Sequence, residues 1–122
     1  MASEGLHEAS ELLDEWTIDQ HRAVTSLIEE FEAVDWYDQR VKATSDSSLA
    51  AILAHNRDEE KEHASMTLEW LRRRDPALDR MLRTYLFTTE PVTEVEAEAE
   101  GGGATPPISA GSLGIGSLKG SE

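Results

Sequence analysis

A glutamate and a histidine three residues apart, Glu60 and His63, are the side chains in this sequence best suited to chemistry. Residues at positions i and i+3 of an α-helix lie one above the other on the same face. A carboxylate and an imidazole placed in this way can hold one transition-metal ion between them. Acidic helices also contain Glu-x-x-His by chance, so the pair gains meaning only from its position on the helix and from further ligands elsewhere in the chain.

The pair lies in a segment with the periodicity of a packed helix, which follows Asp46 and runs to about Arg74. Ser45 or Asp46 is expected to cap its start, because a short side-chain oxygen can accept a hydrogen bond from an unpaired backbone N–H. Glu60 and His63 belong to the apolar side of this predicted helix rather than to its polar side. Alternating steps of four and three residues define that side: Leu49, Leu53, Asn56, Glu60, His63, Thr67 and Trp70.

A second predicted helix, from about Ser10 to Val41, carries another glutamate on its apolar side. Glu30 is in line with Trp16, Gln20, Ala23, Leu27 and Val34. Charged side chains at such positions are costly unless they are paired or bind metal. A metal site is therefore indicated at Glu30, Glu60 and His63. Two alternatives remain: these are buried polar groups that fix the register of the helices, or the apolar sides simply end at solvent. By the same projection, His21 and His55 are surface residues.

One glutamate on one helix and Glu-x-x-His on another form half of the ligand set of four-helix di-iron proteins. A two-helix hairpin cannot cover both of its apolar sides alone, and two hairpins related by a two-fold axis would complete both the bundle and the ligand set. The predicted site then contains two copies each of Glu30, Glu60 and His63 around two ions. Two oxygens and one nitrogen per ion suit iron, with manganese or zinc able to compete.

A second group of residues projects to the opposite side of the first helix. Glu29, Glu32 and Trp36 follow at i, i+3 and i+7, and the two glutamates could hold a metal loosely on its way to the centre. The alternative is a pair of solvated glutamates on an acidic helix. Tyr37 could donate a hydrogen bond to a metal ligand. The alternative for Trp36 and Tyr37 is an ordinary packing role.

The overall composition excludes several classes of protein. The 122 residues have a formal net charge of -14, which argues against nucleic acid as a partner because phosphates require a basic patch. The chain has no cysteine, and therefore no disulfide or thiolate metal site. No apolar run approaches the roughly 18 residues that span a membrane. The first residues lack the features of a signal peptide, so a cytosolic protein is expected.

Composition divides the chain into four parts. We expect a flexible N-terminus over 1–9, a helical domain over 10–89, a disordered linker over 90–111 and a distinct tail over 112–122. A third, short helix begins at Asp75-Pro76, inside the helical domain. The tail contains three large aliphatic residues, Leu113, Ile115 and Leu118, in a glycine-rich background. They indicate a short peptide that docks on a partner, and the alternative is a disordered end.

Three stretches of the predicted helical domain, residues 29–40, 52–63 and 68–73, closely resemble the metal-binding helices of the encapsulated ferritins of bacteria and archaea. Residues 112–119 resemble the peptide by which cargo proteins dock inside encapsulin shells. The resemblance implies a half-ferritin whose ferroxidase centre forms between two subunits, with dimers arranged in a ring that is typically a decamer. It also implies a cytoplasmic protein held inside the encapsulin nanocompartment.

The same resemblance implies a role for each candidate residue. Glu30, Glu60 and His63 match the iron ligands, while Glu29 and Glu32 match proposed metal-uptake carboxylates. Trp36 lies beside the uptake residues, and Tyr37 matches a position next to the ligands.

We therefore expect an all-α fold, an antiparallel two-helix hairpin with a short third helix that dimerises into a ferritin-like four-helix bundle. The expected activity is oxidation of Fe(II) by O2 at a di-iron centre. The alternatives are a helical adaptor stapled by a structural metal, and a di-iron protein that uses peroxide.

Overall fold

The computed structural model describes residues 5–101, and every regular element in that range is helical. The all-α class predicted from the sequence is thereby confirmed. The elements are a 3-10 turn η1 (Ser10–Leu12), two long helices α1 (Glu15–Ala43) and α2 (Ser47–Arg74), and two short helices α3 (Pro76–Tyr85) and α4 (Val92–Gly101). The chain divides into two compact units, the first ending at Leu71 and the second beginning at Arg72. None of the helices in residues 5–101 combines the length and apolar character needed to cross a membrane.

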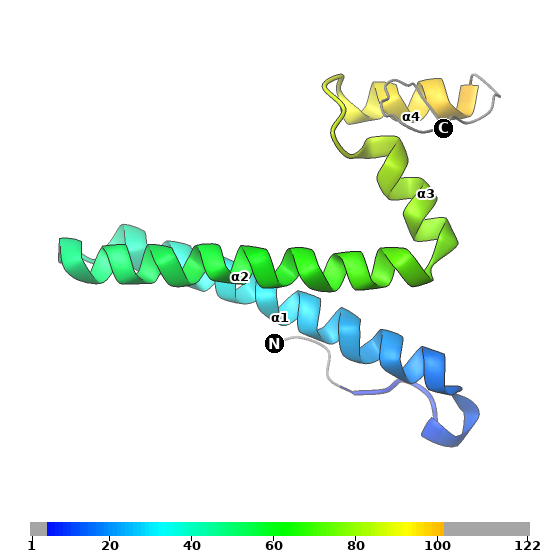
Figure 1. The fold of residues 1–122 in the computed structure, drawn as a ribbon, viewed down its shortest axis with the longest axis horizontal. Coiled ribbons are helices and arrows are strands. Elements are labelled where there is room, and N and C mark those ends of the chain that lie inside the picture. Colours follow the sequence, from blue (N-terminus) through cyan, green and yellow to red (C-terminus); the bar gives the residue numbers. More distant parts are fainter. Residues whose placement is uncertain (1–4, 102–122) are drawn as a thin grey trace. The chain divides into compact units, whose positions relative to one another are not determined.

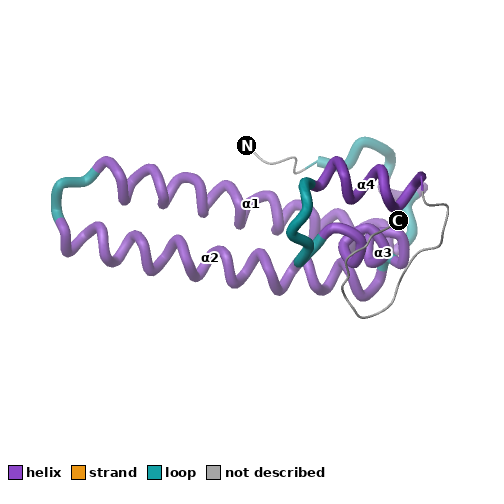
Figure 2. The backbone as a smooth tube through the Cα atoms, turned by 90° about the horizontal axis from the view of Figure 1, so that it is seen from above, coloured by secondary structure: helices purple, strands orange, loops and turns teal. Residues whose placement is uncertain are grey.

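Helices α1 and α2 form an antiparallel hairpin: the view of Figure 2 shows them alongside each other, and Figure 1 shows that α1 crosses α2 at an incline. Each helix starts at an aspartate cap. The Asp14 carboxylate accepts a hydrogen bond from the Thr17 N–H at 2.8 Å, and Asp46 accepts one from the Leu49 N–H at 2.8 Å. The first helix therefore begins at Glu15 instead of near Ser10, because the Asp14 cap sets its start.

Two contacts between distant residues hold α1 against α2, one near each end of the hairpin. The rings of Trp16 and Trp70 stack with centroids 5.7 Å apart and planes inclined by 28°. At the other end, the Arg57 guanidinium donates a hydrogen bond to the Asp38 carboxylate at 2.9 Å, across 19 residues of sequence. Both contacts fix how far one helix is displaced along the other, and so they fix which residues of α1 face which residues of α2.

Residues 5–101 bury little of their apolar surface. Among residues 5–101, only Ala64, Leu71, Val95 and Ala99 are buried apolar side chains. Large apolar residues of the hairpin stay open: Val24 is 39% exposed, Ile28 37%, Phe31 56%, Ile52 57% and Met66 63%. Large apolar side chains exposed on both long helices are typical of a protein that packs against another surface. Within residues 5–101, each long helix thus has apolar side chains that the rest of the described chain does not cover.

The second unit begins with a turn and the helix predicted at Asp75-Pro76. The Asp75 carboxylate accepts a hydrogen bond from the Leu78 N–H at 3.0 Å, and Pro76 occupies the first turn, where its missing N–H costs nothing. Asp79 of α3 then pairs with Arg72 and with Arg83, the latter at 3.0 Å. These contacts stabilise α3, which is too short to be stable by itself.

Helix α4 lies in the segment for which the sequence predicts a disordered linker over 90–111. Val95 and Ala99, four residues apart on one face, are only 2% and 8% exposed, and α4 packs against α3. Alanine and glutamate are both strong helix formers, so two buried contacts suffice to order the alternating acid and small residues. The remainder of the predicted linker, and the tail with Leu113, Ile115 and Leu118, lie outside the described residues.

Candidate metal centre

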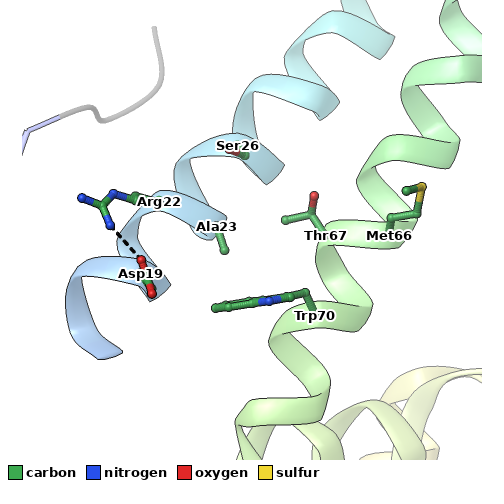
Figure 3. A pocket seen from close by; sticks show the side chains of 7 residues that line it. All are labelled: Asp19, Arg22, Ala23, Ser26, Met66, Thr67 and Trp70. Atoms are coloured by element: carbon green, nitrogen blue, oxygen red, sulfur yellow. Dashed lines mark hydrogen bonds and ion pairs between the residues drawn. The ribbon is translucent and has the colours of Figure 1, made fainter. Parts of the chain in front are cut away.

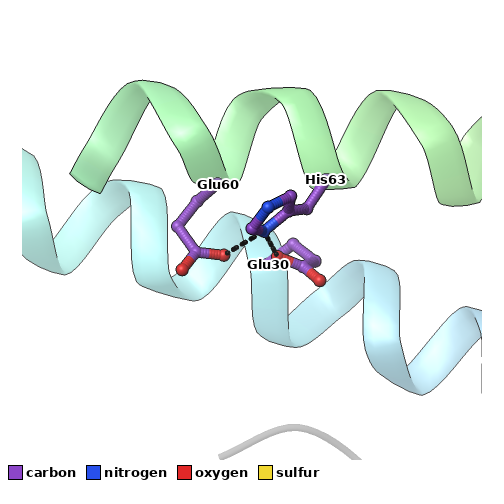
Figure 4. A group of neighbouring side chains, drawn as sticks. All are labelled: Glu30, Glu60 and His63. Carbon is purple, nitrogen blue, oxygen red and sulfur yellow. Dashed lines mark ion pairs between the residues drawn. The ribbon is translucent and has the colours of Figure 1, made fainter. Parts of the chain in front are cut away.

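The three residues predicted as metal ligands come together in the middle of the hairpin. Glu30 projects from α1, while Glu60 and His63 project from α2 toward it (Figure 4). The His63 Nδ1 lies 3.5 Å from a Glu30 carboxylate oxygen and 3.5 Å from a Glu60 carboxylate oxygen. Each of the three side chains has one potential ligand atom that lies within 4.8 Å of the potential ligand atoms of the other two. Within residues 5–101 it is the only group of three or more acidic or histidine side chains this close together.

The secondary structure brings these residues together for simple geometric reasons. Glu60 and His63 are one helical turn apart, so both face α1. Glu30 meets them because the hairpin is clamped on both sides, by the Trp16–Trp70 stack and by the Asp38–Arg57 hydrogen bond. A displacement of α1 by one turn would move Glu30 about 5.4 Å along the axis, beyond reach of the pair on α2.

The carboxyl groups of Glu30 and Glu60 lie so close together that ionisation of one disfavours ionisation of the other. The pKa of Glu30 is raised above its ordinary value, chiefly because its carboxyl shares a hydrogen bond with Glu60, and then because it is partly buried. The negative charge of Glu60 raises it further, and His63 opposes the shift. The Glu30 and Glu60 side chains are only 23% and 25% exposed, so water screens the pair incompletely. A bound cation would remove this repulsion and replace the shared proton.

The arrangement offers a divalent ion two carboxylate oxygens and one imidazole nitrogen. This donor set fits iron, manganese or zinc, and it would leave an ion with positions open to solvent or to further ligands. The His63 side chain is 46% exposed, so the cluster opens outward instead of being enclosed by the chain. One chain thus provides three potential ligands at an open site, and completion of the site by a second copy stays a prediction.

Glu59 contacts His63 and was not among the predicted site residues. Its carboxylate lies 4.0 Å from the His63 Nε2, the ring nitrogen that faces away from Glu30 and Glu60. The sequence contains a signal for this contact, since Glu59 precedes His63 by four residues and side chains at that spacing are neighbours on a helix. The same carboxylate lies 3.9 Å from the Nε2 of His55, one turn earlier.

The other candidate residues do not join the three-residue cluster. Glu29 is exposed and Glu32 half-buried on α1, and neither belongs to the group of close ligand atoms. Trp36 is 48% exposed. Tyr37 is half-buried, and the Arg40 guanidinium lies over its ring, 5.4 Å from the centroid. Their roles in metal uptake and in supporting the ligands stay predictions.

A shallow pocket on the hairpin lies away from these candidate residues. It is lined by Asp19, Arg22, Ala23, Ser26, Met66, Thr67 and Trp70 (Figure 3). Its charged members pair with each other, since Arg22 and Asp19 form a salt bridge at 2.8 Å. None of Glu30, Glu60 and His63 lines it, so the pocket is separate from the three-residue cluster.

Known proteins resemble this chain closely over most of its length. A sequence model of the EncFtn-like family matches residues 5–89. An "Encapsulated ferritin-like protein" of Rhodospirillum rubrum is 59% identical over 127 aligned positions, which cover 98% of this chain and 91% of the relative. A "Ferritin-like protein" of Thermotoga maritima is 57% identical and covers 77% of this chain and 80% of the relative.

A crystal structure of a protein from Nitrosomonas europaea agrees in fold as well as in sequence. It superimposes with a TM-score of 0.71 at 60% identity, over 73% of this chain and 98% of the other. The match with the family covers both long helices, α3 and the three clustered side chains. The chain belongs to the EncFtn-like family, the encapsulated ferritin-like proteins.

Proposed function

We propose that this protein is a ferroxidase that oxidises Fe(II) to Fe(III) with O2 at a di-iron centre formed between two subunits. The observation that carries the proposal is the convergence of Glu30, Glu60 and His63, whose ligand atoms lie within 4.8 Å of one another. Family membership supports iron as the substrate, because ferritin-like proteins take iron and the donor set suits it.

The uncovered surface of the hairpin supports a second copy of the chain as the partner. The cluster opens outward, and exposed apolar residues such as Phe31 and Ile52 lie on the same two helices. A two-fold related hairpin would cover apolar surface of both chains and double the ligands to four carboxylates and two imidazoles. We propose that such dimers make the ferritin-like four-helix bundle and assemble further into a ring, which the family resemblance implies is a decamer.

The chemistry follows from the charges of the ligands. Each Fe(II) gives up one electron, and the two electrons with two protons reduce one O2 to hydrogen peroxide. Carboxylate oxygens favour the more highly charged Fe(III) over Fe(II), so Glu30 and Glu60 lower the free energy of the oxidised product. His63 binds metal through a neutral nitrogen, which makes iron binding weaker in acid. Glu29 and Glu32, with Trp36 beside them, would lead iron toward the centre, and Tyr37 would support a ligand.

The proposed domain organisation gives each part of the chain a role. Residues 10–89 would form the ferroxidase unit, and the tail over 112–122 would dock the protein inside an encapsulin shell through Leu113, Ile115 and Leu118. The Rhodospirillum rubrum relative is named an encapsulated ferritin-like protein, which supports this location. The α1–α2 hairpin, as described over residues 15–74, encloses no storage cavity, so the oxidised iron would be stored in the shell.

The proposal is tested by titrating metal-free protein with Fe(II) while native mass spectrometry counts subunits and ions and an electrode follows O2. We expect two irons per dimer, iron-linked assembly and O2 uptake. Glu30→Ala, Glu60→Ala and His63→Ala should each nearly abolish oxidation. Glu62→Ala is the matched control, since it removes one exposed charge from the same helix and should retain the rate.

Other outcomes distinguish the alternatives. Iron-linked assembly without O2 uptake would identify a structural staple, for which zinc should serve equally well. Oxidation that requires added hydrogen peroxide would identify a peroxide-dependent di-iron protein. A full rate in any of the three ligand variants would contradict the assignment of the centre.

A further inference from the structure

We infer that Glu59 is a positioning residue for the metal centre, which holds the His63 ring with Nδ1 toward the metal and Nε2 toward the Glu59 carboxylate. The inference rests on the proposed function, since it concerns the ligand arrangement at the same centre. Glu59 would not touch the metal itself. It would act through His63.

The orientation of the His63 ring carries the inference. Its two nitrogens face different carboxylates: Nδ1 lies 3.5 Å from both Glu30 and Glu60, and Nε2 lies 4.0 Å from Glu59. A neutral imidazole has one N–H donor and one acceptor, and a metal takes the acceptor. With metal on Nδ1, the proton must be on Nε2. Among the described residues, Glu59 is the only acidic side chain within ion-pair distance of Nε2.

The gap between Nε2 and Glu59 is small enough to close. At 4.0 Å the pair is beyond hydrogen-bond length, but the Glu59 side chain is 47% exposed and keeps the torsional freedom to approach. Histidine ligands commonly donate their second N–H to a carboxylate, which fixes the ring and strengthens the metal bond. The other Glu59 oxygen lies 3.9 Å from His55, so the carboxylate is placed between two imidazoles of the same helix.

The position of Glu59 on α2 separates it from an ordinary surface glutamate. Seven-residue steps return to nearly the same side of a helix, so Glu59 is in line with Ile52 and Met66, which are 57% and 63% exposed. A charged side chain between two open apolar residues is unexpected on a solvated face. A second copy that covers this line would shield the Glu59–His63 contact from water and strengthen it.

The test compares Zn(II) binding, as a diamagnetic probe, in the full-length protein and in three variants. Glu59→Ala should weaken Zn(II) binding about tenfold, the lower end of the effect of removing such a partner because Glu59 is half-exposed. Glu59→Gln keeps an acceptor oxygen and should lose only about threefold. Glu62→Ala also removes one negative charge, from the residue next to His63. Adjacent residues of a helix do not face each other, so this variant should leave the affinity unchanged.

The second readout is the nitrogen chemistry of His63, observed by long-range ¹H–¹⁵N correlation spectroscopy. In Zn(II)-bound wild-type protein we expect metal on Nδ1 and the proton on Nε2. Metal on Nε2, or an unchanged affinity in Glu59→Ala, would overturn the inference while leaving the metal centre in place. A wild-type protein that binds no metal would instead refute the proposed function, and the inference with it.

Discussion

The substitution Glu30→Gln should stabilise the metal-free protein and weaken its metal binding. The perturbation removes one of two clustered carboxylates while keeping a side chain that can still hydrogen-bond to Glu60. At 4.8 Å, the upper limit of the distances between ligand atoms in the cluster, two unit charges repel by about 1 kcal/mol at the dielectric constant of water and by about 3.5 kcal/mol at an effective value of about 20. Because both side chains are partly covered and wild-type Glu30 can take up a proton, we expect a gain of about 1 to 2 kcal/mol near neutral pH.

The pH dependence of this gain has a definite sign. The pKa of Glu30 is raised in the folded protein, so folding favours its protonated form, and the wild-type protein has its full relative stability below the ordinary value of 4.5. That stability declines as pH rises through the folded-state pKa. The Gln variant carries no charge there and avoids the decline, so its advantage should be small in mild acid and largest at alkaline pH.

The assay is urea unfolding followed by circular dichroism, with chelator present and equal protein concentrations, from about pH 5 to about pH 8. Glu29→Gln is the matched control, since it removes the neighbouring exposed charge of α1 outside the cluster. The two variants should diverge as pH rises. Adding Zn(II) should raise the unfolding midpoint of the wild-type protein more than that of Glu30→Gln. A Glu30→Gln protein that is less stable than wild type across the whole range would refute the reasoning.

Three further substitutions test other parts of the structure. Asp38→Asn should lower the urea midpoint at neutral pH. The pKa of Asp38 is lowered chiefly by its hydrogen bond to Arg57, so this stabilisation exists above the ordinary value of 3.8, and wild type and variant should converge as pH falls through the folded-state pKa. Asp46→Ala should cost about 1 kcal/mol in urea unfolding by removing the α2 cap, whereas Asp46→Asn should cost little. Val95→Asp should unfold α4, seen as lost helical circular dichroism and faster amide exchange there, while Zn(II) binding is retained.

The helices and their caps could be predicted because they depend on local sequence. Periodic apolar residues define α1 and α2. Asp46 and Asp75 each cap the start of a helix, because their carboxylates accept a hydrogen bond from the backbone N–H three residues later. The start of α1 was predicted several residues too early, since Asp14 and the extended backbone before it compete with helix propensity. Helix α4 was missed because its order depends on burial of Val95 and Ala99, which composition does not reveal.

The sequence by itself determined which side chains carry the candidate chemistry and on which face of its helix each one lies. The tertiary structure alone decided how they meet. The Asp38–Arg57 hydrogen bond and the Trp16–Trp70 stack set the displacement of α1 along α2, and with it the 3.5 Å approach of His63 Nδ1 to Glu30. Helical periodicity repeats every turn and therefore allows several such displacements, whereas contacts between residues distant in sequence select one.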